Sequence, residues 1–341
     1  MSNSMNDTSL YSGPGIEEKD LGRDKEGKIA NVKGRTIMKT TEFSRKKTII
    51  YLLFTFIVAY AMQVAIYCLY KSGTAFVYQY FMSAMMFVPF FGALVSGYSF
   101  KNIGWKPVFK GNIKTILFVW FGPALLTAIG ALIYFLIFPQ HFDLSGRYVV
   151  EAAGEEALKQ MEAQGITYPM QVLISCIACI TYAPALNALF AIGEEVGWRG
   201  FLYPQLKARF GRQKGWLIGG AIWGAWHWPV IWLIGYEYGF EYIGFPVSGM
   251  LLFVVITIAL GIICDWTYEK SGCIWLPSLF HGAFNAIATV TIAVLIPGTT
   301  SARLLGPAPN GLIAGIPLFA TALFIYLKSN WKGTGLNCNE E

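Results

Sequence analysis

The stretch 170–199 reads MQVLISCIACITYAPALNALFAIGEEVGWR, and its long apolar run ends in two adjacent carboxylates, Glu194 and Glu195. A charge near the centre of a bilayer costs at least ~2.5 kcal/mol on insertion scales, so a charge retained there needs a partner or a function. Further along the chain, two apolar segments carry one histidine each, His227 and His281. An acidic pair together with isolated imidazoles in lipid predicts a functional site inside a membrane.

The composition around this stretch predicts a membrane protein. The 341 residues are 55% hydrophobic and only 13% charged, which departs from ordinary globular usage. A spanning helix needs ~20 predominantly apolar residues, and eight stretches of the chain qualify. We therefore expect an all-α membrane protein, a bundle of about eight transmembrane helices with a polar intramembrane cavity. The stretches are 48–70, 75–98, 113–138, 170–195, 215–235, 247–266, 273–296 and 311–328.

The pattern of apolar stretches divides the chain into four predicted parts. Residues 1–47 are polar and lack the apolar core of a cleavable signal peptide, so we expect a flexible cytoplasmic tail that is not removed. Three N-terminal transmembrane helices occupy residues 48–138. A core of four transmembrane helices, which carries the acidic pair and both histidines, occupies residues 170–296. A C-terminal transmembrane helix occupies residues 311–328.

Basic residues predict the orientation of the bundle. They gather before the first predicted span, between the second and third, and between the fourth and fifth, whereas residues 139–168 hold five acidic against two basic residues. By the positive-inside rule, the basic boundaries and both termini are cytoplasmic. The same bias explains the net charge of +6, so we expect no nucleic-acid partner. The basic residues are Arg45, Lys46, Lys47, Lys101, Lys106, Lys110, Lys207, Arg209, Arg212 and Lys214.

The acidic pair has a neutralising partner close by in the sequence. Glu195 and Arg199 are four residues apart, the spacing that places an acid before a base on one helix face. We therefore expect Arg199 to neutralise Glu195 and to fix its rotamer, and we interpret this pair, taken alone, as structural. Glu194 points about 100° away from that face and stays available for chemistry.

Each histidine also shares a helix face with a second side chain. Trp223 and His227 are four residues apart, so the aromatic ring can shield or orient the imidazole, and His281 and Asn285 present a ring nitrogen beside a carboxamide. At ~1.5 Å per residue, His227 lies about 18 Å and His281 about 12 Å from the inner ends of their helices. These depths let the two histidines meet Glu194. A single intramembrane histidine equally suits a hydrogen bond between helices, so the prediction depends on the set.

This set of groups suits hydrolysis of a peptide bond. Glu194 and His227 around one water can act as a general base, while His281 and Asn285 can donate hydrogen bonds to the developing oxyanion. Two histidines and a glutamate also make a catalytic zinc set with an open position, so Glu194, His227 and His281 are the zinc ligands if a zinc ion is used. No HExxH helix is present. We favour no cofactor and keep zinc as an open alternative.

Three spacings together resemble those of the CAAX protease and bacteriocin-processing (CPBP) family of intramembrane proteases, which includes the type II CAAX prenyl endopeptidases and the abortive-infection proteins. The family hallmarks are EExxxR, then FxxxH, then HxxxN, and the resemblance covers roughly residues 185–290. One departure is Trp223 where the family usually has Phe, a change that we expect to alter pocket shape more than chemistry. The matching residues are Glu194, Glu195, Arg199, Trp223, His227, His281 and Asn285.

The resemblance implies an intramembrane endopeptidase whose catalytic core is residues 170–296. It implies that the first Glu acts as base with the histidine of the second motif, and that the last His and Asn stabilise the oxyanion. The second Glu, the Arg and Trp223 then have supporting roles. Family members are described both as metalloproteases and as glutamate proteases. Because Asn285 is a poor third zinc ligand and Glu194 is available as a base, we favour the glutamate type.

The expected substrate is a membrane-associated or lipid-anchored peptide or protein that reaches the inner half of the bilayer, with membrane lipid as the surrounding partner. The sequence leaves substrate identity, dependence on a prenyl group and oligomeric state open. A second interpretation is a non-proteolytic immunity or scaffold protein whose polar cluster only joins helices. A transporter is disfavoured, because the polar groups lie at one depth and no inverted repeat is visible.

Overall fold

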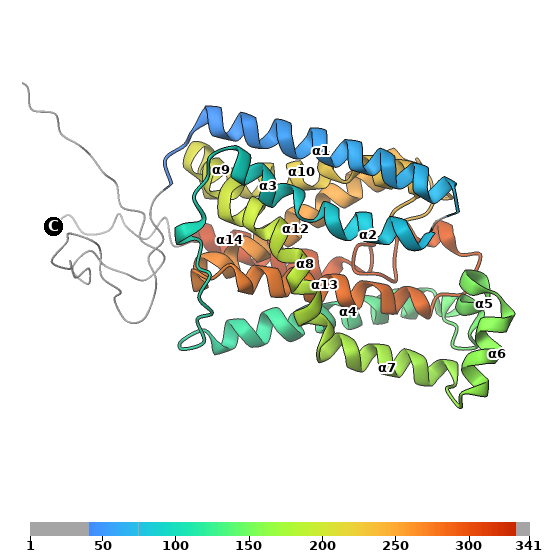
Figure 1. The fold of residues 1–341 in the computed structure, drawn as a ribbon. Helices are drawn as coiled ribbons and strands as arrows, with labels where there is room; N and C mark the ends of the chain where they lie inside the picture. The colour runs from blue at the N-terminus through green and yellow to red at the C-terminus, as the bar shows by residue number, and fades with distance from the viewer. Residues whose placement is uncertain (1–40, 74, 332–341) are drawn as a thin grey trace, which may run out of the picture.

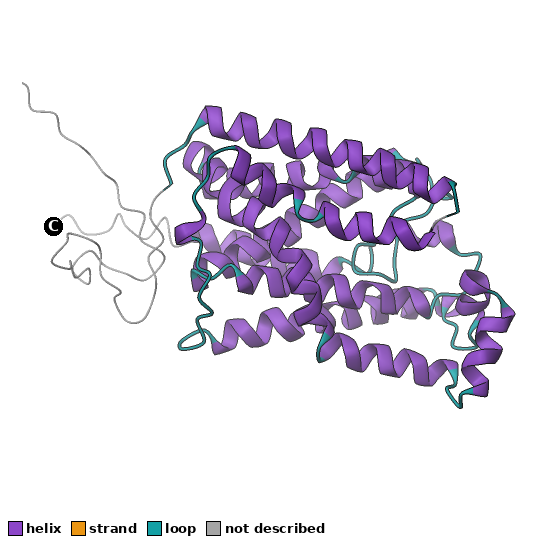
Figure 2. Ribbon diagram, in the orientation of Figure 1, coloured by secondary structure: helices purple, strands orange, loops and turns teal. Residues whose placement is uncertain are grey.

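The computed structural model describes residues 41–73 and 75–331 as helices joined by loops (Figures 1 and 2). Most of the predicted tail, residues 1–40, lies outside the described residues. Within the described ranges no strand is formed, and the β-type pairing consists of one isolated bridge between Phe142 and Leu295. The predicted all-α fold is confirmed.

The helices of the described chain alternate between long apolar rods and short connecting segments. In chain order they are α1 (Arg45–Lys71), α2 (Ala75–Met85), α3 (Val88–Val95), α4 (Ile113–Ile137), α5 (Arg147–Ala153), α6 (Glu155–Ala163), α7 (Tyr168–Ile180), α8 (Ala183–Gly197), α9 (Tyr203–Phe210), α10 (Arg212–Trp226), α11 (Trp228–Ile234), α12 (Val247–Ser271), α13 (Trp275–Ala293) and α14 (Ile316–Trp331). In Figure 1, α8 and α13 cross in the middle of the bundle, whereas α5 and α6 cap one end.

Five helices of the described chain are long and apolar enough to cross a membrane, so the expected count of eight is not confirmed. They are α1, α4, the continuous stretch Arg212–Ile234 that contains α10 and α11, α12 and α13. A sixth span results if α6 and α7 are taken together, although they bend by 82°. The apolar stretches Tyr80–Val95 and Ile316–Ser329 are shorter.

Proline explains why two predicted spans are not continuous helices. The span predicted over 170–195 breaks at Thr181, and α8 restarts with Pro184 in its first turn. The span predicted over 75–98 breaks in the same way before Pro89, in the first turn of α3. Proline lacks the backbone N–H that an interior helical position needs and clashes with the preceding turn. It is tolerated at the start of a helix, and both helices use it there.

The outer surface of the bundle carries large apolar side chains. Leucine and isoleucine usually belong to the buried interior of a water-soluble protein. Here Leu53, Ile57, Leu125, Leu132 and Leu136 are each more than half exposed. Extensive exposed apolar surface of this kind indicates contact with a membrane. The chain is therefore an integral, multi-pass membrane protein.

The loops gather at two opposite ends of the bundle. Backbone and side-chain contacts at one end join the segments that the basic residues predict to be cytoplasmic, and contacts at the other end join the predicted outer segments. The first group comprises 41–47, 97–112, 203–214 and 265–275. The second group comprises 138–143, 236–246 and 292–310. This grouping agrees with the predicted alternation of the loops, while the side that faces the cytoplasm stays a prediction.

Ion pairs join two segments at the first end. Lys207 Nζ lies 2.6 Å from Asp265 Oδ2 and 2.9 Å from Glu269 Oε1, and Arg212 also contacts Glu269. Burial disfavours the Lys207 ammonium, but the two carboxylates outweigh burial and raise the pKa of Lys207. The contacts place the end of α12 beside α9.

Glycines allow close approach of the helices that carry the functional side chains. A Cβ added to Gly220 on α10 would lie 2.4 Å from Ile258 Cα on α12. A Cβ added to Gly282 on α13 would lie 2.4 Å from the backbone N of Ala188 on α8. Small residues at such contacts are typical of helix packing in membranes. They bring α8, α10, α12 and α13 together around one point.

Replacement of Gly220 by Ala is expected to destabilise the bundle. The added methyl group has to push α10 and α12 apart, and overpacking of this kind costs typically ~1–3 kcal/mol. Thermal unfolding of the detergent-solubilised protein measures the effect. Gly200→Ala is the matched control, because its Cβ would lie 3.7 Å from the nearest atom, Ile103 Cδ1. Equal midpoints for Gly220→Ala and the wild type would contradict the packing described here.

Candidate active site

The acidic pair lies at the C-terminal end of α8, where this helix packs closely on the start of α3. A Cβ at Gly193 or Gly197 would come within 2.7 Å or 2.5 Å of backbone oxygens there. Glu194 and Glu195 follow Gly193 directly and are 3% and 0% exposed. Two carboxylates with so little access to solvent need hydrogen-bond or charge partners.

The chain changes its helical geometry directly after the acidic pair. Residues Trp198–Leu202 form a π-helical turn, in which the Tyr203 N–H donates to the Trp198 carbonyl. Trp198 and Arg199, the first residues of this turn, are completely buried. Single π turns within helices occur frequently at functional sites.

Glu194 is held by two indoles through one of its oxygens. Trp198 Nε1 donates to Glu194 Oε2 at 3.1 Å, and Trp223 Nε1 donates to the same oxygen at 2.7 Å. Within the described residues, no hydrogen bond reaches Oε1. One carboxylate oxygen is thus fixed, while the other remains able to accept a proton.

Glu195 has different partners, although it is the adjacent residue. Its Oε1 accepts from Arg199 Nη1 at 3.0 Å, as the four-residue spacing predicts, and lies 2.9 Å from His281 Nδ1. Because a carboxylate only accepts, the His281 proton facing Glu195 lies on Nδ1. The His281 Nε2 then donates only when the ring carries both protons.

Two aromatic rings enclose the Arg199 guanidinium. Its Cζ lies 4.3 Å from the centroid of the Trp223 ring and 4.7 Å from that of Tyr203. Cation–π contacts of this kind are stronger when water is excluded. Arg199 Nε and Nη2 have no hydrogen-bond partner among the described residues, so Glu195 and the two rings are the main compensation for burying this charge.

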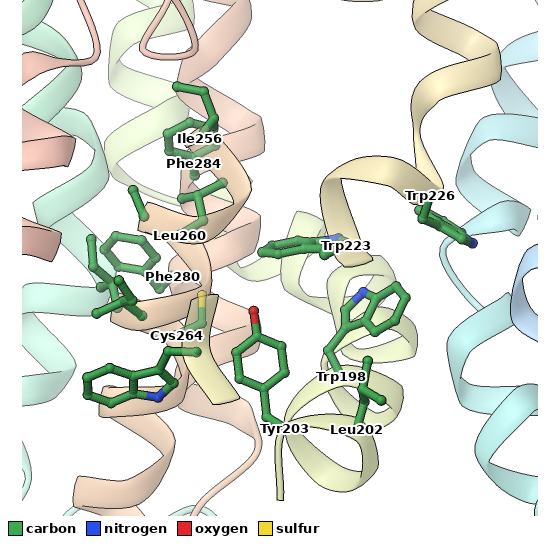
Figure 3. Packing of buried hydrophobic residues seen from close by; sticks show 14 of the residues in the cluster. Trp198, Leu202, Tyr203, Trp223, Trp226, Ile256, Leu260, Cys264, Phe280 and Phe284 are labelled. Carbon is green, nitrogen blue, oxygen red and sulfur yellow. The ribbon is translucent and has the colours of Figure 1, made fainter. Parts of the chain in front are cut away.

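Trp223 is the residue at which the three sequence motifs meet. Its indole N–H binds Glu194, its ring packs edge-on against His281 at a centroid distance of 5.3 Å, and its carbonyl oxygen accepts from His227 Nδ1 at 3.0 Å. Of the two expectations for this pair, Trp223 orients His227 through its backbone carbonyl, and the shielding of His227 by the Trp223 ring stays a prediction. The side chain faces Glu194 and His281, because a side chain on α10 points across the bundle toward α8 and α13 (Figure 3).

His227 lies at the break between α10 and α11. Pro229, in the first turn of α11, ends α10 there and leaves His227 as the junction residue. Since the Trp223 carbonyl only accepts, His227 carries its proton on Nδ1, and the neutral ring presents Nε2 as an acceptor. Phe253 and Tyr236 pack against the ring at centroid distances of 4.8 Å and 6.3 Å.

Asn285 lies one helical turn after His281 on α13, as its spacing predicts. It is partly exposed, and its carboxamide makes no hydrogen bond within the described residues. Its side chain is thus not committed to another residue. Glu194, His227 and His281 meet at Trp223, whereas no contact among the described residues ties Asn285 to them.

The three residues that would be zinc ligands each make a hydrogen bond through one atom, and Glu194 Oε1 and the Nε2 atoms of both histidines stay without a partner among the described residues. Glu194 Oε2 accepts from two indoles, and the Nδ1 atoms of His227 and His281 face a carbonyl and a carboxylate. Across residues 41–73 and 75–331, no three His, Cys, Asp or Glu side chains are gathered closely enough to hold a metal ion. The zinc alternative stays a prediction, and no chemical step below passes through a metal ion.

The contacts of Trp198, Phe253 and Tyr236 in the site were among those missed by sequence reasoning. Trp198 stands four residues after Glu194, so the same spacing that identifies the Glu195–Arg199 pair could have indicated its hydrogen bond to Glu194. Phe253 comes from α12 and Tyr236 from the loop after α11. Their contacts with His227 depend on how separate helices pack, for which the sequence holds no local signal.

The fold and the site define an integral membrane protein with a buried glutamate, arginine and histidine cluster at the crossing of its central helices. Residues 166–287 match the family described as type II CAAX prenyl endopeptidase Rce1-like. Over 101 residues, the chain is 32% identical to CAAX prenyl protease 2 of Methanococcus maripaludis. This alignment covers 29% of the present chain and 37% of the length of that relative.

The segment that contains all three motifs therefore matches the model of the CAAX prenyl endopeptidase family. The matched residues include α7 to α12 and the motif-bearing part of α13. The resemblance inferred from three spacings over roughly residues 185–290 is confirmed. The match leaves α1 to α6 and α14 outside the family domain.

Proposed function

We propose that this protein is an intramembrane endopeptidase of the glutamate type. The observation that carries the proposal is that the two adjacent carboxylates have different hydrogen-bond partners. Glu195 binds Arg199 and His281 through Oε1, and its Oε2 is buried without a partner among the described residues. Glu194 is oriented through Oε2, keeps Oε1 available, and is the slightly more exposed of the two, at 3% against 0%. A general base needs an oriented acceptor with an open lone pair, and Glu194 meets this requirement.

In the proposed reaction, a water molecule lies between Glu194 Oε1 and His227 Nε2. Glu194 accepts a proton from the water while the water oxygen bonds to the carbonyl carbon of the substrate. The carbonyl π electrons move to the carbonyl oxygen. The oxyanion electrons then re-form the C=O bond as the C–N bond breaks, and Glu194 returns its proton to the leaving nitrogen. The products are an amine and a carboxylic acid, which loses its proton to solvent. No covalent enzyme intermediate is required.

The oxyanion formed in this reaction needs hydrogen-bond donors. The His281 ring, when it carries both protons, donates through Nε2, and the uncommitted Asn285 carboxamide supplies a second N–H. Removal of one such donor typically costs about 10²–10³-fold in kcat. Glu195 supports this role because it faces His281 Nδ1 at 2.9 Å and orients the ring.

The substrate that we propose is a membrane-associated or lipid-anchored peptide. The family domain and the relative carry the names of prenyl endopeptidases, which supports a substrate held at the membrane. From these names we propose for this chain an endopeptidase activity and a substrate that is located at the membrane. Because the alignment spans little more than a third of that relative, a prenyl group remains one candidate anchor among others.

Chelation is expected to leave the activity intact. The proposed water activation uses the Glu194 carboxylate and His227 and needs no metal ion. Cleavage should therefore continue after incubation of the purified protein with 1,10-phenanthroline, measured as product formed per minute. Activity lost on chelation and regained on adding zinc would contradict the glutamate mechanism.

A comparison of membrane peptides tests the proposed function. Cells that carry the wild type or Glu194→Gln are compared for new peptide termini in the membrane fraction. The proposal predicts at least one cleavage product that is absent in the variant, and that product also identifies the substrate. If the protein is instead an immunity or scaffold protein, the variant keeps full biological function and the two sets of termini are the same.

A further inference from the structure

We infer that Trp223 is a positioning residue whose indole N–H, together with that of Trp198, holds the Glu194 carboxylate in the orientation needed to activate water. This inference rests on the proposed function, since it assigns a role within the same site. It differs from the expectation drawn from sequence, in which Trp223 in place of Phe alters pocket shape more than chemistry.

The geometry assigns the two indoles to one carboxylate oxygen. Both Nε1 atoms donate to Glu194 Oε2, at 2.7 Å from Trp223 and 3.1 Å from Trp198. The two rings lie next to each other with centroids 6.5 Å apart (Figure 3). Both side chains are buried, so water does not compete for these donors. Two donors on one oxygen fix the plane of the carboxylate and direct the second oxygen away from the indoles.

The two donors come from different elements, which makes the arrangement rigid. Trp198 stands on the π turn that continues α8, the helix of Glu194 itself, whereas Trp223 stands on α10. A donor on the same helix moves with Glu194, but a donor on α10 ties Glu194 to the helix of His227. The Trp223 bond therefore fixes the distance between the two groups that share the water.

Phenylalanine cannot make this bond, although it supplies an aromatic ring. The Trp223 ring also packs on Arg199 and His281, and a phenyl ring retains part of that packing. The change Trp223→Phe thus removes the N–H donor and keeps an aromatic ring, whereas truncation of the side chain would remove both. It also restores the residue that the family motif usually has at this position.

Trp216→Phe is the matched control. Trp216 lies on the same helix, is equally buried, and its Nε1 also donates to a carboxylate, Asp265 Oδ2, at 2.6 Å. That carboxylate lies at the end of α12, outside the site. Both variants lose one indole-to-carboxylate hydrogen bond, so a loss of stability common to the two does not account for a loss of activity confined to one.

The experiment measures kcat, KM and the pH–rate profile of both variants on the substrate that the membrane comparison identifies. For Trp223→Phe we expect kcat to fall about tenfold or more with KM unchanged, since a hydrogen bond to a charged group is worth at least about one power of ten. The acidic limb of its profile should also move to higher pH, because a carboxylate that loses a donor is protonated more readily. Trp216→Phe should keep the wild-type kcat and profile.

Two outcomes would overturn the inference. One is a Trp223→Phe protein with wild-type kcat and an unshifted profile. The other is an equal loss of kcat in Trp216→Phe, which would assign the effect to general stability. If Trp223→Phe does not fold, Trp198→Phe removes the second donor and carries the same test. These results are distinct from failure of the proposed function, in which Glu194→Gln itself retains cleavage.

Discussion

Replacement of Glu194 by Gln is expected to lower kcat by roughly 10²–10⁴-fold, the usual contribution of a general base. Glutamine has nearly the same shape, and its amide oxygen can still accept from both indoles. It has no carboxylate to take a proton from water. The measurement is single-turnover cleavage by purified protein in detergent. Folding is checked by thermal unfolding, for which we expect a midpoint close to that of the wild type.

The matched control for this change is Glu156→Gln, which alters an exposed glutamate on α6. It should leave kcat and the unfolding midpoint unchanged. Cleavage at the wild-type rate by Glu194→Gln would remove this residue from the mechanism. A strongly lowered midpoint in Glu194→Gln would instead show that the carboxylate mainly holds the helices together.

Replacement of Arg199 by Ala is expected to produce the largest loss of stability. Glu195 would keep only His281 as a partner at a position with no solvent access. Breaking a buried ion pair by removal of one member typically costs ~3–5 kcal/mol, because the remaining charge is uncompensated. The rings of Tyr203 and Trp223 would also lose the group that lies between them. Thermal unfolding in detergent and the yield of folded protein measure this effect.

Arg209→Ala is the control for the arginine change. Arg209 is exposed near the end of α9, and substitutions at such positions usually change stability by less than ~0.5 kcal/mol. A wild-type unfolding midpoint for Arg199→Ala would mean that Glu195 is either protonated or reached by water. It would contradict the structural role assigned to the pair.

The fold class could be predicted from sequence because it follows from composition, whereas the helix breaks require attention to single residues. The apolar content alone indicates a helical membrane bundle. The breaks before Pro89 and Pro184 are encoded locally by proline, but an apolar run that continues through the proline hides them. The run 311–328 begins with a loop, and α14 starts only at Ile316. Its hydropathy does not distinguish a packed loop from a helix.

Contacts within one helix could be predicted at the candidate site, and contacts between helices could not. The Glu195–Arg199 pair follows from a spacing of four, and the Glu194–Trp198 bond follows from the same rule. The Glu195–His281 contact joins α8 to α13, which approach closely because position 282 is glycine. Motif order indicates that such residues meet. It does not reveal that the second Glu, rather than the first, binds the histidine.

Joint action of Glu194 and His227 on one water is tested most directly by a double-mutant cycle. The kcat is measured for Glu194→Gln, for His227→Ala and for the combined variant on the same substrate. Residues that act as a unit show strongly non-additive losses, so we expect the double variant to be about as slow as the slower single variant. Losses that multiply in full, or a single variant with wild-type kcat, would contradict a shared water.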